Sequence, residues 1–227
     1  MKRKGTEITY RPGEHGEKFD AIARLSSVLA HKINNPLTFM TNYLFLLRQT
    51  SLCDEGALGM VGSIEGGVHR TRDILRELLD ASRPCTGPRE DIDLKRIIND
   101  SLKCMPEAMA DIKVRVDVPA ALTVRTEGEG LMDAITILGA NAIESGSGKV
   151  VFSASSEGGR TVIRVQDSGG GIPPEAIALI FDPLYTTREG HMGLGLYRAY
   201  HIAASLGGSV WCKSWVSCSE FTLELPE

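Results

Sequence analysis

A repeating spacing of apolar residues between Phe19 and Leu47 constrains the fold of this chain more than any other feature. Apolar residues recur there at steps of three and four, which is the period of one stripe along an α-helix. The stripe consists of Ile22, Leu25, Leu29, Ile33, Leu37, Met40, Leu44 and Leu47. The segment TSLCDEG interrupts the pattern, and a second helical stripe follows. The second stripe consists of Met60, Val61, Ile64, Val68, Ile74, Leu75, Leu78 and Leu79.

Two amphipathic helices joined by a short turn predict an antiparallel hairpin. A lone hairpin buries too little apolar surface to be stable, whereas two hairpins form a four-helix bundle that covers both stripes. We therefore expect residues 17–83 to form a homodimeric four-helix bundle. Residues 1–16 are polar and predict a short flexible tail. Residues 84–90 contain two prolines and a glycine, and they predict a linker.

Residues 91–227 alternate between strand-like and helical patterns. Strand patterns cover residues 112–118, 122–127, 149–157, 160–167, 209–216 and 220–226. Helical patterns cover residues 93–105, 130–146 and 194–208. Strand hairpins interleaved with helices predict an α/β sandwich with helices on one face of a mixed sheet. The predicted fold class of the whole chain is therefore α+β.

Composition and charge exclude several classes of function. A net charge of -4 and a pI of about 5.8 give no reason to expect a nucleic acid as the main partner. No apolar run is long enough to cross a bilayer, and the first ten residues have no apolar core for a signal peptide. The five cysteines are scattered without CxxC spacing, which favours reduced thiols over disulfides or a zinc site. We therefore expect a cytoplasmic protein without a membrane span.

His31 lies inside the first helical pattern, in the stretch AHKINNPLTFM. It is two positions from Leu29 and from Ile33, about 200° from each around a helix, so its ring faces away from the apolar stripe. Pro36 cannot donate a hydrogen bond to the carbonyl of Lys32, which predicts a loosened or kinked helix beside the histidine. An exposed neutral imidazole can attack a phosphoryl group near pH 7. An ordinary solvent-facing histidine is the alternative, but broken helix rules favour a functional site.

A buried carboxylate is predicted at the end of the strand TVIRVQD. Ile163, Val165 and Asp167 alternate onto the same face, which should be the core face. A carboxylate there is costly unless it accepts hydrogen bonds, and an adenine exocyclic amine is a suitable donor. The following glycines at 169–171 let the backbone approach a flat base. A strand that simply ends in a glycine turn is the alternative.

The segment FDPLYTTREGHMGLGLYRAY is rich in glycine and runs directly into a helical pattern. Gly193 and Gly195 would expose backbone N–H groups near the helix N-terminus, which is a natural seat for phosphate. Thr186, Thr187 and Arg188 supply hydroxyls and a cation beside it. The segment is neither a Walker A motif nor a Rossmann fingerprint, and a glycine-rich loop alone is a weak signal.

The order of these motifs resembles the bacterial two-component sensor histidine kinases. The motifs are the histidine followed by NNP, then NAIE, DSGGGI, FDPLYTT, GLGL and a closing FTLELP, and the resemblance covers nearly all of residues 19–226. It implies a dimerisation and histidine phosphotransfer hairpin, followed by an ATP-binding domain of the type shared with gyrase, Hsp90 and MutL. It further implies ATP and Mg²⁺ as ligands and a response-regulator receiver domain as phosphate acceptor.

The resemblance assigns roles to individual residues of this chain. His31 corresponds to the phosphoacceptor, and Asn35 to the position that relatives use to place water during response-regulator dephosphorylation. Asn141 corresponds to the asparagine that binds Mg²⁺, and Asp167 to the aspartate that reads adenine. The other implied nucleotide contacts are Gly169 and Gly171 around the adenine, Phe181 before the lid, Thr187 and Arg188 near the phosphates, and Gly193, Leu194 and Gly195 in the phosphate loop.

Lys32 departs from the family pattern, in which the residue after the phosphoacceptor is usually Glu or Asp. That carboxylate is thought to orient the imidazole and to take its proton. An ammonium with a pKa near 10.4 is not a base at pH 7, and it disfavours a cationic imidazole. We therefore expect a histidine kinase with slow autophosphorylation. Ile137 is a second departure, because many relatives have another asparagine one turn before Asn141.

Two alternatives to a working kinase stay open at this stage. The chain could be a degenerate family member that acts as a phosphatase or phosphotransfer scaffold, or a dimeric nucleotide-binding ATPase switch without histidine phosphorylation. Lys32 could also steer phosphate, leave the base role to water, or be a substitution introduced to trap one state. The residues before the first helix are too few for a folded sensor, so input comes from a partner or the bundle itself, or the chain is a fragment.

Overall fold

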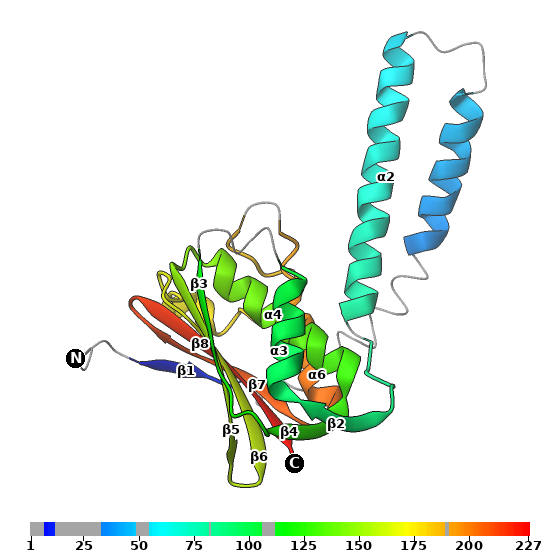
Figure 1. Cartoon of the computed structure of the whole chain (residues 1–227). Coiled ribbons are helices and arrows are strands. Elements are labelled where there is room, and N and C mark those ends of the chain that lie inside the picture. The colour runs from blue at the N-terminus through cyan, green and yellow to red at the C-terminus, as the bar shows by residue number, and fades with distance from the viewer. Residues whose placement is uncertain (1–6, 12–32, 49–54, 82, 106–111, 189–190) are drawn as a thin grey trace. The chain divides into compact units, whose positions relative to one another are not determined.

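The computed structural model describes most of the chain as two compact units. The described residues are 7–11, 33–48, 55–81, 83–105, 112–188 and 191–227. One unit is a helical hairpin within Glu17–Ser82. The other unit comprises Arg83–Glu227 together with the N-terminal Met1–Gly16. Figure 1 shows the two helices of the hairpin and the sheet of the second unit.

The hairpin unit consists of a helix over residues 33–48 and of α2 (Glu55–Ala81). The facing sides of the two helices form a small apolar core in which buried residues recur every seven positions. This core contains Leu37, Leu44, Val61, Val68 and Leu75, with Ile33 and Leu79 packed against it. Beside the core, Arg48 Nη2 lies 2.8 Å from Glu65 Oε2. His31, Lys32 and the kink predicted beside them lie outside the described residues.

Part of the apolar surface of the hairpin stays exposed within one chain. Met40 and Leu47 belong to the predicted stripe, yet they are 51% and 47% exposed, whereas Leu37 and Leu44 are buried. Two packed helices can cover only the side on which they meet, and the stripe is wider than that contact. Although α2 is long, no helix among the described residues is apolar enough over a sufficient length to span a bilayer.

The second unit is built on a six-stranded sheet with the strand order β1-β7-β8-β6-β5-β3. Its strands are β1 (Ile8–Tyr10), β3 (Lys113–Asp117), β5 (Lys149–Glu157), β6 (Arg160–Asp167), β7 (Ser209–Trp215) and β8 (Cys218–Pro226). Only β3 and β5 pair in parallel, and the other neighbours are antiparallel. A separate antiparallel pair is formed by β2 (Arg89–Asp93) and β4 (Thr123–Glu127).

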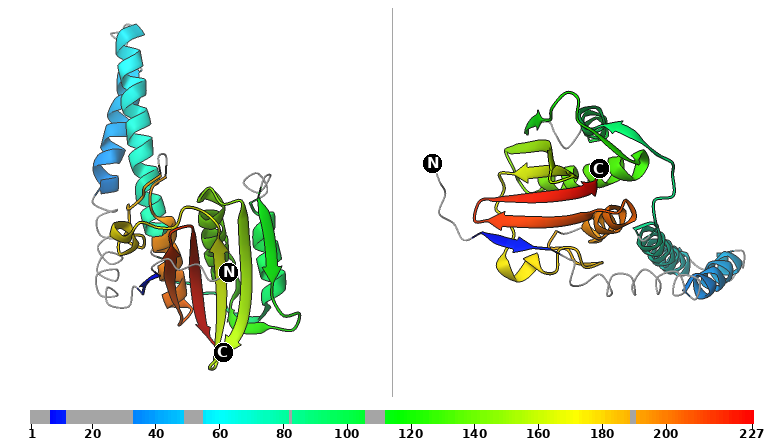
Figure 2. Two further views of the ribbon diagram at one scale, coloured as in Figure 1. Left: turned by 90° about the vertical axis from the view of Figure 1, so that its left-hand side faces the viewer. Right: turned by 90° about the horizontal axis from the view of Figure 1, so that it is seen from below.

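Helices α3 (Leu94–Lys103), α4 (Gly128–Glu144) and α6 (Gly195–Ser205) lie on one face of this sheet, as Figures 1 and 2 show. A fourth helix, α5 (Pro174–Ile177), is a single turn. The apolar side of α4 packs on the sheet, and the core between them is fully buried. Its members include Leu131, Ile135, Leu138, Phe152 and Ile163. This arrangement confirms the predicted fold class.

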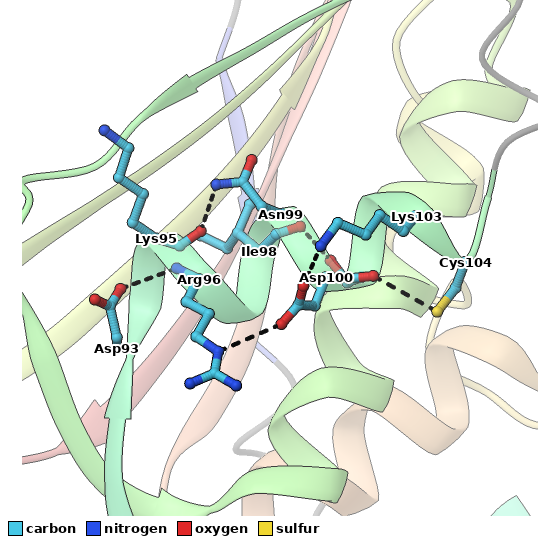
Figure 3. Close-up of polar contacts among 9 residues, drawn as sticks. Asp93, Lys95, Arg96, Ile98, Asn99, Asp100, Lys103 and Cys104 are labelled. Carbon is cyan, nitrogen blue, oxygen red and sulfur yellow. Dashed lines mark hydrogen bonds and ion pairs between the residues drawn. The ribbon is translucent and has the colours of Figure 1, made fainter.

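Helix α3 shows how local sequence sets the ends of these elements. The side chain of Asp93 accepts a hydrogen bond from the Arg96 backbone N–H at 2.9 Å, which caps the first turn (Figure 3). On the exposed side, Asp100 Oδ1 accepts from Lys103 Nζ at 2.7 Å, and this bond lowers the pKa of Asp100. The opposite side carries Leu94 and Ile98, which are completely buried.

The structure differs from the sequence analysis at two segments. Residues 8–10 form β1 at the edge of the sheet, where the sequence predicts a flexible tail. The predicted linker 84–90 ends inside β2, because Arg89 and Glu90 pair with Glu127 and Thr126 of β4. Both strands are short, and both gain their hydrogen bonds from partners distant in the sequence, so local patterns signal them weakly. The other domain boundaries stay predictions.

The burial of Ile98 predicts a large effect on stability. We expect Ile98→Ala to lower the free energy of unfolding of the second unit by about 2–5 kcal/mol, because it removes buried methyl groups and leaves a cavity. Lys95→Ala is the matched control, since Lys95 lies on the exposed side of the same helix and should change stability by less than about 0.5 kcal/mol. Urea denaturation followed by circular dichroism measures both, and equal losses would contradict the described packing of α3.

Candidate nucleotide-binding site

The buried carboxylate of Asp167 marks the centre of the candidate site. Asp167 ends β6 on the face that carries Ile163 and Val165, and it is only 3% exposed. Its Oδ1 accepts a hydrogen bond from the Gly169 N–H at 2.8 Å, and its Oδ2 accepts one from the Ser219 hydroxyl. These bonds offset the cost of burying a carboxylate and hold it in one orientation.

The glycine loop after β6 is packed closely against neighbouring backbone. Gly171 has a φ of +73°, and a Cβ atom there would lie 2.0 Å from the carbonyl oxygen of Trp215. A Cβ atom on Gly169 would lie 2.5 Å from Ser145 Oγ. Ser214 Oγ accepts a hydrogen bond from the Ile172 N–H at 2.7 Å, which ties the loop to β7. The loop is therefore fixed between the end of α4 and the end of β7.

The segment before α6 leads into the first turn of that helix, where backbone N–H groups lack a side-chain cap. Gly193 has a φ of +68°, and its carbonyl accepts from the Leu184 N–H at 3.0 Å, which closes the loop between them. Leu194 is buried, and α6 begins at Gly195 without a side-chain cap. The first turn of α6 thus offers N–H groups that suit an anion. The nearest atom to a Cβ on Gly195 is Ile137 Cγ2 at 3.6 Å.

Arg188 is held by the end of α4. Its Nη1 donates to Glu144 Oε2 at 2.8 Å, and its Nη2 donates to the Asn141 backbone carbonyl at 3.1 Å. Thr186 Oγ1 accepts from the Arg188 N–H at 3.0 Å, whereas Thr187 is exposed. The sequence analysis places Arg188 near phosphates, and the structure shows that its guanidinium is engaged by Glu144. Arg188 therefore joins the segment after Phe181 to the helix of Asn141.

Phe181 anchors the start of that segment in the core. The ring is completely buried, and its centroid lies 6.5 Å from that of Phe221 in an edge-to-face arrangement. On another side, the ring of Tyr10 from β1 stacks on it, with centroids 6.1 Å apart and planes at 21°. Aromatic pairs in these geometries stabilise each other beyond their buried area.

The donor set fits a nucleotide with one magnesium ion. Within the described residues, no cluster of three or more His, Cys, Asp or Glu side chains could hold a metal by itself. Mg²⁺ in nucleotide sites needs few protein ligands, because phosphate oxygens and water complete its shell. Asn141 lies one turn after Ile137, the residue nearest to Gly195, so its position beside the phosphate segment suits this role.

The structure assigns the predicted site residues to two groups. The ten predicted nucleotide contacts all lie in the second unit, in or next to β6, α4, α6 and the segments between them. Asn35 lies in the hairpin unit, exposed on the helix of residues 33–48. His31 and Lys32 lie outside the described residues, so their predicted roles stay predictions.

Sequence reasoning did not single out Ser219, Ser214 or Glu144. Ser219 could have been found, because it alternates with Phe221 and Leu223 onto the buried face of β8, where a lone hydroxyl needs a partner. The pairing of Glu144 with Arg188 spans 44 positions in the chain, and no local pattern announces such a contact.

Two family models match the chain in consecutive order. The model of the His Kinase A phospho-acceptor domain matches residues 21–87, which include His31. The model of the histidine kinase-, DNA gyrase B- and HSP90-like ATPase matches residues 126–227, which include Asp167 and the glycine segments. The chain belongs to the histidine kinase family. It carries both domains of a histidine kinase catalytic core.

Similar proteins support this membership. Sporulation kinase D of Bacillus subtilis is 28% identical over 223 residues, which are 95% of this chain and 44% of that protein. The sensor histidine kinase ZraS of Escherichia coli K12 is 27% identical over 216 residues, which are 92% of this chain and 46% of that protein. The kinase core described here spans less than half the length of either relative.

Solved histidine kinases share the fold. Full-length ShkA in complex with AMPPNP superposes with a TM-score of 0.64 at 23% identity, over 89% of this chain and 45% of that one. The histidine kinase ThkA in complex with the response regulator TrrA gives a TM-score of 0.61 at 22% identity, over 95% of this chain and 64% of that one.

The close approach at Gly171 predicts a selective loss of nucleotide binding. We expect Gly171→Ala to weaken the affinity of the kinase for ADP about tenfold or more, because the left-handed φ and the contact with the Trp215 carbonyl force the loop to move. Gly170→Ala is the matched control, since a Cβ atom there meets nothing within 4 Å. Titration with a fluorescent ADP analogue measures both, and an unchanged affinity of Gly171→Ala would contradict a nucleotide site at this loop.

Proposed function

We propose that this chain is an autophosphorylating histidine kinase core that transfers the γ-phosphoryl group of ATP to His31 and passes it on to an aspartate of a response-regulator receiver domain. One observation carries the proposal: a phosphoacceptor domain containing a histidine precedes an ATPase domain on the same chain. The carboxylate of Asp167 adds physical support, because two hydrogen bonds already hold it in one orientation.

The nucleotide would be held by four features of the second unit. Asp167 accepts the exocyclic amine of adenine, while Gly169 and Gly171 keep the loop packed beside it, because a side chain at either position would meet Ser145 or Trp215. The loop of Gly193, Leu194 and Gly195 offers N–H groups to the phosphates. Asn141 holds Mg²⁺, which when bound neutralises phosphate charge. Thr187 is exposed and free to donate its hydroxyl, and Arg188 has to share its charge between Glu144 and a phosphate.

The chemical step belongs to His31. A ring nitrogen of the neutral imidazole attacks the γ-phosphorus, the bond to the β–γ bridging oxygen breaks, and ADP leaves. The imidazole then gives up its proton. The Lys32 ammonium cannot accept that proton at pH 7, so water or buffer takes it and the step is slow. Asn35 follows His31 by four positions in the sequence and would place water for dephosphorylation of the receiver.

Apolar side chains that stay exposed in one chain support a proposal for its partners. The exposed apolar side chains of the hairpin support a homodimer, in which a second hairpin covers Met40, Leu47, Met60 and Ile64. The ThkA structure contains a response regulator, which is the class of acceptor proposed for this chain. A separate sensor or input protein stays a further expected partner, and the cytoplasm the expected location.

A degenerate kinase is the second candidate, and Lys32 is the feature that favours it. Loss of the base with retention of Asn35 would shift the balance from autophosphorylation towards phosphatase activity. Nucleotide binding without labelling of His31 would select this candidate. ATP hydrolysis that survives His31→Ala would instead select an ATPase switch.

The effect of Lys32 on rate gives the first test. We expect wild type to incorporate label slowly from γ-labelled ATP with Mg²⁺, and Lys32→Glu to incorporate it about 10²–10⁴-fold faster because a carboxylate restores general-base help. The label should be acid-labile, base-stable and absent from His31→Ala. Equal rates for wild type and Lys32→Glu would contradict the role assigned to Lys32, and label that persists in His31→Ala would contradict the phosphoacceptor.

The exposed apolar side of the hairpin gives the second test. We expect Met40→Glu to weaken dimerisation by about tenfold or more, because it places a charge in the proposed helix–helix contact. Thr38→Glu is the control, since Thr38 is also exposed but lies about 200° away around the helix. Sedimentation equilibrium measures the dimer dissociation constant of each. A Met40→Glu protein as dimeric as wild type would show that this side is not the interface.

A further inference from the structure

Strand β1 brings a segment from ahead of the phosphoacceptor into the nucleotide-binding domain. Ile8, Thr9 and Tyr10 pair antiparallel with Ser214, Lys213 and Cys212 of β7. Figure 1 shows this strand in blue at the edge of the sheet, beside β7. Tyr10 precedes His31 by 21 positions in the sequence. The N-terminal segment and the domain that holds the nucleotide are therefore joined by a main-chain ladder.

Side chains on the outer face of β1 reinforce the pairing. The Arg11 guanidinium lies over the Trp211 ring at 4.5 Å from its centroid, and Lys213 Nζ lies 5.5 Å from the same centroid. The indole N–H of Trp211 donates to Glu224 at 2.9 Å, and Arg11 lies 3.5 Å from the same carboxylate. At the start of the strand, Glu7 pairs with Lys213 at 2.9 Å. Opposite charges thus match β1 to this edge at both of its ends.

The inner face of β1 reaches the nucleotide site through Phe181. The Tyr10 ring stacks on Phe181, which is completely buried and starts the segment that leads to Arg188 and Gly193. Phe181 in turn contacts Phe221, two residues after Ser219, the residue that holds the Asp167 carboxylate. Removal of the Tyr10 ring would leave one side of this aromatic group without its packing partner.

The strand that receives β1 also supports the glycine loop. Ser214, the partner of Ile8, accepts the Ile172 N–H at 2.7 Å and donates to the Ile172 carbonyl at 3.2 Å. The next carbonyl along β7, that of Trp215, is the one that leaves no room for a side chain on Gly171. β7 thus pairs with β1 along one edge, and the C-terminal end of β7 contacts the loop proposed to bind adenine.

We propose that residues 7–11 are a docked positioning strand, which supports the nucleotide pocket through Tyr10 and β7 and thereby links the segment ahead of His31 to nucleotide affinity. The proposal rests on the nucleotide binding proposed above. In the structure, the strand that pairs with the edge of β7 is β1 of the same chain. Because coupling between two events is reciprocal, bound nucleotide must also hold the strand more firmly on β7. A partner that draws this segment away would lower nucleotide affinity.

Nucleotide affinity of Tyr10 variants tests the first half of this coupling. We expect Tyr10→Ala to weaken binding of a fluorescent ADP analogue with Mg²⁺ about two- to tenfold, the range that an aromatic pair supports. Tyr10→Phe should restore the affinity, because it keeps the ring. Thr9→Ala is the control on the same strand, since Thr9 is exposed and lies on the opposite face of β1 from Tyr10. Circular dichroism and thermal melting check that each variant is folded.

Hydrogen exchange of the wild-type chain tests the other half without any substitution. We expect ADP with Mg²⁺ to slow amide exchange in peptides that cover residues 7–11 and 209–215. Protection that depends on protein concentration would point to strand exchange between chains and overturn the pairing within one chain. Normal ADP binding with unchanged exchange, or with unchanged affinity of Tyr10→Ala, overturns the positioning strand alone. A wild-type chain that binds no ADP overturns the proposed kinase function as well.

Discussion

The architecture of the nucleotide-binding domain depends on one buried charge, the carboxylate of Asp167. A carboxylate at 3% exposure is tolerated only with hydrogen-bond donors in place, and here they come from two separate segments. The Gly169 N–H comes from the loop after β6, and the Ser219 hydroxyl comes from β8. The first bond holds the loop close to the end of β6, and the second ties the start of β8 to the end of β6. The same oxygens that these donors orient would face the amine of an adenine.

The periodic elements of the second unit could be predicted from the sequence because each carries its own signal. Every strand and helix predicted between residues 93 and 226 is present, and Asp167 lies on the core face as its alternation indicated. Two strands were not predicted. β1 has only three residues, and β2 follows two prolines, so the stability of both comes from pairing with distant strands.

The parts of the candidate site that depend on backbone conformation could be predicted from the sequence. Positions 171 and 193 have a left-handed φ, which favours glycine. The sequence motifs already have glycine at both positions. Side-chain pairing was not predictable in the same way. Arg188 was expected at the phosphates, whereas its guanidinium is bonded to Glu144 and to the Asn141 carbonyl. An arginine paired with a carboxylate presents less net charge to an anion, so Glu144 moderates the attraction that the sequence alone would assign to Arg188.

Lys32 has two opposite effects on the proposed chemistry, and their magnitudes decide the outcome. Its positive charge keeps the imidazole of His31 neutral, which favours attack, but two unit charges 4 Å apart in water interact by only about 1 kcal/mol. Loss of a general base lowers a rate about 10²–10⁴-fold, which corresponds to roughly 3–5 kcal/mol of barrier. The imidazole is also largely neutral near pH 7 without help, because its unperturbed pKa is about 6.5. In the proposed mechanism the lost base therefore outweighs the electrostatic gain, so we expect proton removal from His31, and not nucleotide binding, to limit the rate.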